Sequence, residues 1–295
     1  MNLKSVCATV TAAIALLMPQ AVFMQKTADA GEFIAKERAG LINWSAGYLE
    51  ATGKAVILAE NMKRISARPA AVRNARVEAG RNLLELTKNI AVDSMTTVGM
   101  LMTENDIINI QVEGLIKKAA QTGLLYLPGG AVEVKLRLPL YGELSQIVTP
   151  SGIEKRIAAA SATAVASVSK TSASPDGAET AGRFATGLVI DARGFEFRPA
   201  IWPHLYDEKG REIYGFSARS HECSTDRGAC GYSRDSVIPG RNERAGENPI
   251  IVRAIGTGPA GGSDLVIAND DAFRLLTLEA ENHFLKNCRV LILLD

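Results

Sequence analysis

A histidine and a cysteine lie close together in His221-Glu222-Cys223, a spacing that could support nucleophilic chemistry. An exposed histidine beside a cysteine can favour the thiolate, which is the reactive form of the sulfur. The only other histidines are His204 and His283, and His283 is expected at the end of a helix, where a cation is favoured without any reaction. A thiol enzyme or hydrolase that uses His221 and Cys223 is therefore one interpretation of the sequence.

Disulfide formation is the competing role for Cys223. Cys223 and Cys230 are close in sequence within a loop that contains glycine and serine, so they are natural disulfide partners in an oxidising compartment. Oxidation would remove the thiol chemistry. Cys288 directly precedes Arg289 and the apolar residues 290–292, and it is expected to be a small buried hydrophobic residue. No pair of cysteines has the spacing of a zinc site, so no metal is predicted.

Three polar residues, Asp191, Arg193 and Arg198, follow a predicted buried strand at 187–190, where the chain leaves the sheet. Binding residues are common at such positions, so these three are the candidate interaction residues. The plainer interpretation of Asp191 and Arg193 is a structural ion pair.

A glycine pattern at 256–261 satisfies the dinucleotide-binding spacing G-x-G-x-x-G. A phosphate-binding loop must open a helix, whereas residues 263–267 are predicted to continue as a strand. A turn between two antiparallel strands is the better interpretation. The sequence therefore predicts no cofactor and no catalytic residue.

The N-terminal residues 1–30 have the three parts of an export signal. Lys4 provides a positive start, an interrupted apolar run follows over 6–24, and small residues form a cleavage site at 28–30. The uninterrupted part of the run is shorter than the roughly 20 residues of a membrane-spanning helix. We therefore expect cleavage before Gly31, a periplasmic location that could include association with the outer membrane, and no transmembrane span in the mature chain.

Charge is nearly balanced, with 33 basic and 32 acidic residues. Loss of the expected signal would make the two counts equal. Nucleic-acid binders need a surplus of lysine and arginine to displace counterions, so nucleic acid is not an expected partner.

The apolar pattern predicts an α+β fold of two small domains, 31–150 and 183–295, joined by an Ala- and Ser-rich linker at 151–182. The first is expected to follow the order strand, helix, helix and hairpin. The second is expected to be mainly β with one long helix.

In the first domain, residues 41–56 suit a strand with a turn inside it. A helix is expected to follow near Pro69, and a second one is expected to begin at Thr103, whose hydroxyl could cap the first turn. Two apolar runs around Pro128-Gly129-Gly130 predict a hairpin over 123–138.

Two stretches resemble a bacterial envelope family of small outer-membrane lipoproteins and flagellar assembly protein T-like proteins. The resemblance includes residues 186–200 and continues through Asn248-Pro249, 264–267 and 288–290. It implies a role in the cell envelope, in some members around the flagellar basal body, and no enzymatic activity. The chain lacks the cysteine of a lipoprotein signal.

These observations favour a non-enzymatic periplasmic protein that docks onto envelope or flagellar proteins, in flagellar or surface-structure assembly, with oligomerisation open. The thiol enzyme or hydrolase is the alternative. A small-ligand or glycan binder that uses Trp44 or Trp202 as a stacking face is a further one.

Overall fold

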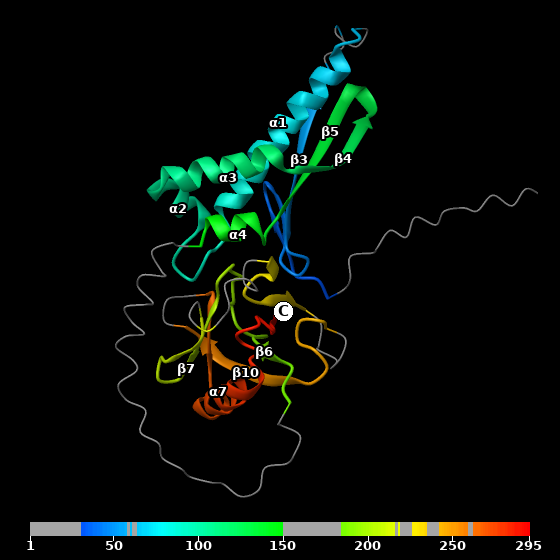
Figure 1. Ribbon diagram of the computed structural model, residues 1–295. Helices are drawn as coiled ribbons and strands as arrows, with labels where there is room; N and C mark the ends of the chain where they lie inside the picture. Colours follow the sequence, from blue (N-terminus) through cyan, green and yellow to red (C-terminus); the bar gives the residue numbers. More distant parts are fainter. Residues whose placement is uncertain are drawn as a thin grey trace, which may run out of the picture.

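The computed structural model describes residues 31–57, 60, 64–149, 184–215, 218, 226–234, 242–258 and 262–295. They form two α+β regions, each built on one sheet, and this confirms the predicted fold class (Figure 1). The predicted signal at 1–30 and the predicted linker at 151–182 lie outside the described residues. Within the described ranges, no helix has the length and apolar character needed to cross a membrane.

The first sheet is antiparallel and has the strand order β1-β2-β3-β5-β4. Its strands are β1 (Ile34–Glu37), β2 (Gly40–Asn43), β3 (Tyr48–Val56), β4 (Ala120–Leu127) and β5 (Ala131–Pro139). β3 and β5 pair along their whole length, from Tyr48 opposite Pro139 to Val56 opposite Ala131. This long pair extends away from the second region as an arm (Figure 1).

Helix α1 (Ala67–Lys88) covers one face of the arm. Its buried small and apolar residues recur at spacings of three and four and form one stripe: Ala71, Ala75, Ala79, Leu83 and Leu86. A Cβ at Gly53 of β3 would meet the Ala79 backbone at 2.1 Å, so glycine permits the close approach of helix and strand. The other helices of the region are α2 (Val98–Glu104), α3 (Asp106–Lys118) and α4 (Glu143–Ile147).

The predicted helix start at Thr103 is wrong. Thr103 lies inside α2, where its hydroxyl donates to the carbonyl of Gly99 at 2.9 Å. The chain is extended at Asn105, whose side-chain oxygen accepts from the backbone N–H groups of Ile107 and Ile108 and caps α3. An asparagine cap satisfies the same free N–H groups that the threonine cap was expected to satisfy. Ile107, in the first turn of α3, is 66% exposed.

The second sheet is mixed and has the order β8-β7-β11-β10-β6-β12-β9. Its strands are β6 (Gly187–Asp191), β7 (His204–Asp207), β8 (Glu212–Tyr214), β9 (Gly231–Ser233), β10 (Pro249–Thr257), β11 (Asp264–Ile267) and β12 (Val290–Leu293). β10, β6, β12 and β9 run parallel to one another. β6 and β12 are apolar and buried on both faces, as suits the inner strands of a parallel sheet. Helix α7 (Asn269–Asn282) belongs to this region and is the long helix that was expected there.

The two regions are in direct contact around Tyr232 of β9. Its ring lies edge-on to Trp44, with 5.5 Å between the ring centroids. Its backbone carbonyl accepts a hydrogen bond from the Ser45 hydroxyl. Its own hydroxyl donates to the Ala200 carbonyl and accepts from the Ala200 N–H. Burial raises the pKa of Tyr232 well above its usual value, so the hydroxyl keeps its proton and continues to donate.

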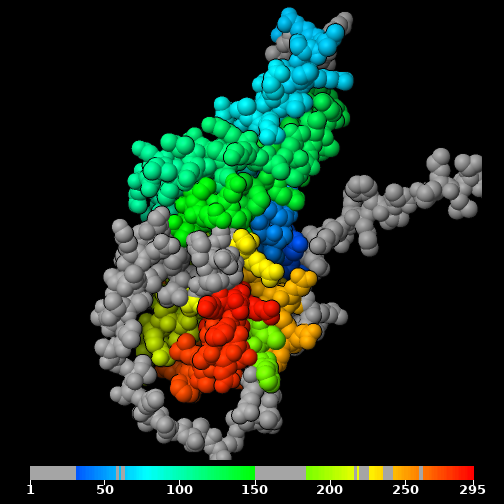
Figure 2. Space-filling view, in the orientation of Figure 1, coloured from blue at the N-terminus to red at the C-terminus, as the bar shows by residue number. Residues whose placement is uncertain are grey.

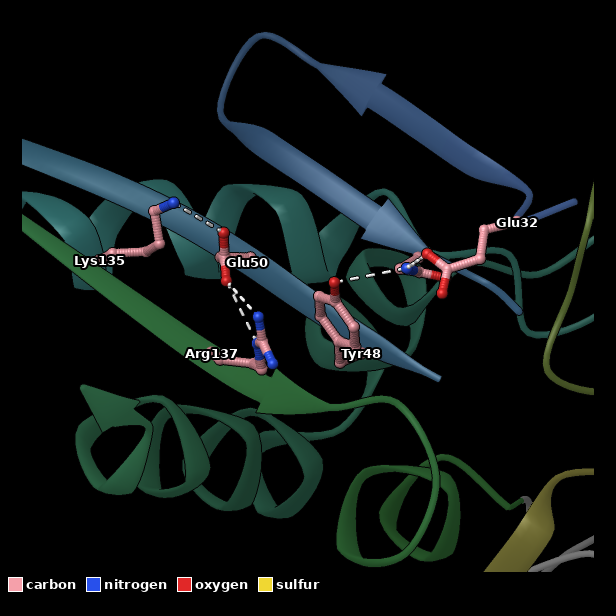
Figure 3. Close-up of polar contacts among 6 residues, drawn as sticks. Glu32, Tyr48, Glu50, Lys135 and Arg137 are labelled. Atoms are coloured by element: carbon pink, nitrogen blue, oxygen red, sulfur yellow. Dashed lines mark hydrogen bonds and ion pairs between the residues drawn. The ribbon is translucent and has the colours of Figure 1, made fainter. Parts of the chain in front are cut away.

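The face of the arm opposite α1 carries a charged cluster around Glu50 (Figure 3). The Glu50 carboxylate accepts from Arg137 at 2.8 and 3.2 Å and lies 3.2 Å from the Lys135 ammonium. The Arg137 guanidinium also stacks over the Tyr48 ring at 4.0 Å. Because the Glu50 side chain is only 10% exposed, this cluster anchors β5 on β3.

Replacement of Glu50 should destabilise the arm. Glu50→Gln removes the carboxylate that holds both cations, and we expect a loss of about 1–2 kcal/mol in the free energy of unfolding. Lys54→Gln is the matched control, since the Lys54 side chain is 66% exposed and its ion pair with Glu133 should contribute less than about 1 kcal/mol. Urea unfolding of both variants measures the difference. Equal losses would show that the Glu50 cluster has no special role.

Candidate docking surface

β4 is the edge strand of the first sheet, and its apolar side chains are exposed. β5 is its neighbour on one side, and the other side ends the sheet. Leu125 and Tyr126 are 55% and 59% exposed, and Leu124 and Leu127 are also exposed. Figure 2 shows the hairpin of β4 and β5 lying along the arm, away from the second region. Edge strands of this kind offer unpaired backbone groups to another strand.

Both faces of β4 carry large apolar residues. Tyr126 pairs with Val132 and Leu124 with Val134, and these valines are buried on the α1 side. Leu125 is opposite Glu133, on the charged side of the sheet. α1 packs mainly over β3 and β5, so it leaves β4 uncovered. Within the part of the chain that the structure describes, the strand is therefore open along its edge and over much of both faces.

Edge strands usually carry charges or proline, which prevent unwanted pairing. β4 has neither, and the segment 119–132 contains no charged residue. The absence of charge over 119–132 is visible in the sequence. The sequence alone does not show which strand of the predicted hairpin lies at the edge of the sheet.

The position of β4 is fixed at both ends. At its start, the Arg76 guanidinium donates to the Ala119 carbonyl at 3.2 Å and to the Gln121 side chain at 3.3 Å. At its end, the turn over Pro128–Gly130 has two glycines with φ of 78°, a conformation that glycine adopts without strain. The Arg68 guanidinium lies 5.9 Å from the centroid of the Tyr126 ring. The exposed strand is thus held by its own region rather than by a partner.

A groove of about 510 Å³ lies between α1 and α3. It is lined by Arg76, Val77, Gly80, Arg81, Leu84, Glu113, Ile116, Lys117 and Leu136. The floor is largely apolar, and three cations face one carboxylate at the rim. Arg81 lies 3.8 Å from Glu78 in an exposed pair. The groove enlarges the apolar area that is accessible on this side of the arm.

The predicted interaction residues do not converge on one site. Asp191 and Arg193 form the expected ion pair, with contacts of 2.8 and 2.7 Å. These hydrogen bonds from Arg193 hold the pKa of Asp191 below its usual value. Among the described residues, the Arg198 side chain makes no ion pair with Asp191; it lies against Gly262. The structural ion pair is thus the interpretation that the geometry supports.

The predicted pairing of Cys223 with Cys230 is contradicted at Cys230. Cys230 is a buried thiol, and it lies close enough to Tyr232 to raise the pKa of that hydroxyl. Cys288 is buried as expected but is disulfide-bonded rather than a simple hydrophobic residue. His221 and Cys223 lie outside the described residues. Sequence proximity favoured the local pair, whereas disulfide geometry depends on how distant strands are placed.

Two other expectations concern binding sites. Trp44 and Trp202 are each only 4% exposed, so neither offers a ring face to a glycan. The glycine pattern at 256–261 begins in the last two residues of β10, which is antiparallel to β11, as the turn interpretation requires. Its last three residues, 259–261, lie outside the described ranges. Among described residues, no group of three metal-binding side chains comes together.

The Asp191–Arg193 pair should make stability depend on pH in the acid range. The folded-state pKa of Asp191 lies below that of the unfolded chain, so the pair stabilises the fold above the usual carboxyl pKa of 3.8. This contribution is lost as the pH falls through the folded-state value. Asp191→Asn should lower the free energy of unfolding at neutral pH. The free energy of unfolding of this variant should also fall less steeply in acid than that of the wild type. Urea unfolding over a pH series measures both effects. An unchanged pH slope would contradict this assignment.

Alkylation should distinguish the two described cysteines. In denaturant without reductant, iodoacetamide should modify the Cys230 thiol and leave Cys288 unmodified. Cys288 should react only after reduction, because a disulfide sulfur is not a nucleophile. Peptide mass mapping reads both sites in one sample. Modification of Cys288 before reduction would rule out its disulfide.

Residues 187–295 match a protein family described as Treponema pallidum Tp0624, second domain. The match begins at the first residue of β6 and includes the whole second sheet with α7. No curated protein matches the chain. The arm and its edge strand lie outside the match, and the resemblance to flagellar assembly protein T-like proteins stays a prediction. The second region of this chain is therefore similar to the second domain of Tp0624.

Proposed function

We propose that the chain is a non-enzymatic docking protein of the bacterial cell envelope, and that β4 on the arm is its docking element. The partner would add a strand to the open edge of the first sheet. The observation that carries this proposal is an edge strand without charge whose Leu124, Leu125, Tyr126 and Leu127 are all exposed.

Strand addition supplies two kinds of contact. Main-chain hydrogen bonds to the open side of β4 would provide affinity, and the alternating side chains would provide specificity. Leu125 and Leu127 would contact the partner on the charged face of the sheet, and Leu124 and Tyr126 on the α1 face. A partner strand with apolar residues on both faces fits this surface best.

The cellular setting rests on the sequence. The export signal over 1–30 supports a periplasmic location, and the family resemblance supports flagellar or surface-structure assembly. A protein that works there by docking needs a rigid body that holds its binding edge, here strand β4, in a fixed position. The contacts of Tyr232 with Trp44 and Ser45 join the arm to the second region and support that role.

Site-specific photocrosslinking in cells tests the proposal. A photoreactive amino acid at Leu125 should form a discrete adduct, because this side chain would be covered by the partner strand. The matched control places the same amino acid at Ile107, which is also apolar and exposed but lies on α3. Gel shifts and mass spectrometry identify the adducts.

The proposal predicts an adduct from position 125 and none from position 107. Absence of any adduct at 125 would refute docking through β4. Equal adducts from both positions would show random collision rather than docking.

A further inference from the structure

We infer that the strand added to β4 is β4 of a second copy of this chain, in a two-fold symmetric dimer with one continuous sheet. This inference rests on the proposed function, since it names the partner of the same edge. The argument begins with the regular part of the strand. The pairing of β4 with β5 is irregular between Gln121 and Gly123, which leaves Gly123–Leu127 as a regular strand centred on Leu125.

An antiparallel pair of identical strands centred on Leu125 is self-complementary. Leu125 then lies opposite Leu125 of the second copy, and Leu124 lies opposite its Tyr126. Gly123 lies opposite the second copy's Leu127, where the absence of a side chain leaves room for the leucine. Opposite residues in an antiparallel pair share a face, so each of these contacts joins residues on the same side of the sheet.

Charge also favours a second copy. Identical strands that carry a charge near the symmetry axis place like charges together, which is destabilising. The segment 119–132 has no charge, so this penalty is absent. A distinct partner protein would allow complementary charges on β4, and the chain has none there.

The neighbouring elements leave space for the second copy. α1 packs mainly over β3 and β5, and the two copies of α1 would be separated by the two β4 strands. Adjacent strands are about 4.8 Å apart, so helices over β5 on either side would be more than about 10 Å apart.

The contact is small. Side chains from one eight-residue strand cover less than the about 800 Å² per partner of a standard interface. We therefore expect a reversible dimer that dissociates in the micromolar range, rather than an obligate one.

Charge-swap variants at the symmetry axis test the register directly. The full chain, as it is processed in cells, is purified and studied by analytical ultracentrifugation over a concentration series. The wild type should move from monomer to dimer. Leu125→Lys and Leu125→Glu should each be monomeric, because each places like charges opposite each other. An equal mixture of the two variants should dimerise, since lysine then faces glutamate.

The control variant is Ile107→Lys, which adds a charge at an exposed apolar position outside β4 and should dimerise like the wild type. Thermal unfolding of all variants checks that each is folded. A monomeric wild type at every concentration would overturn the inference, and so would a dimer that the position-125 variants do not weaken. Failure of the mixture to restore the dimer would overturn the register centred on Leu125.

The two proposals fail in different ways. A monomeric wild type together with a photocrosslink from position 125 to another protein would reject the second copy and keep the docking role. A dimer by ultracentrifugation with a self-adduct from position 125 supports both. A monomer without any adduct rejects both.

Discussion

The full-length pairing of β3 with β5 is the constraint on which the first region depends. It runs from Tyr48 opposite Pro139 to Val56 opposite Ala131 and makes the sheet long enough to project as an arm. Its alternation sends Val132, Val134 and Leu136 toward α1 and Glu133 toward the charged face. β4 pairs with the free side of β5, because β3 occupies the other side of β5. The exposed edge is therefore a direct result of this pairing.

The two faces of the β3–β5 pair are held by different forces. Burial of the α1 stripe removes apolar surface from water and requires Gly53, where helix and strand meet most closely. The other face relies on Glu50, which neutralises Lys135 and Arg137 across the strands. Each face fixes the register independently, since a slip of one residue would expose the apolar side chains and bury the charged ones. A well-fixed register is what presents β4 in a single, defined position.

Local patterns predicted much of the fold correctly. The helix near Pro69 and the hairpin around Pro128-Gly129-Gly130 each depend on residues that are close in sequence. The helix boundary near Thr103 was wrong because two residue types that cap helices, Thr103 and Asn105, lie two positions apart and compete for the same role. Strand β9 was not predicted, because three residues carry too little periodicity.

Features that depend on distant parts of the chain were harder to predict. Leu124 and Leu125 are adjacent apolar residues, a pattern typical of a strand buried on both faces. Only the three-dimensional arrangement shows that no layer of the described structure covers them. The disulfide of Cys288 was missed for the same reason, since disulfide geometry depends on how distant parts of the chain are placed. Asp191 and Arg193 are two positions apart, and their pairing was predicted.

The contacts between the two regions have a consequence for the time at which the chain can fold. The Gly31 carbonyl accepts from Ser233, 202 positions later in the sequence, and Ser45 donates to Tyr232 across 187 positions. Native contacts over such separations form slowly. The entropy of closing a long loop is lost before the contacts that stabilise the loop can form. These contacts between the two regions cannot form until most of the chain has been synthesised. Such delayed folding would suit a polypeptide that has to be threaded through a translocation channel before it acquires its final shape.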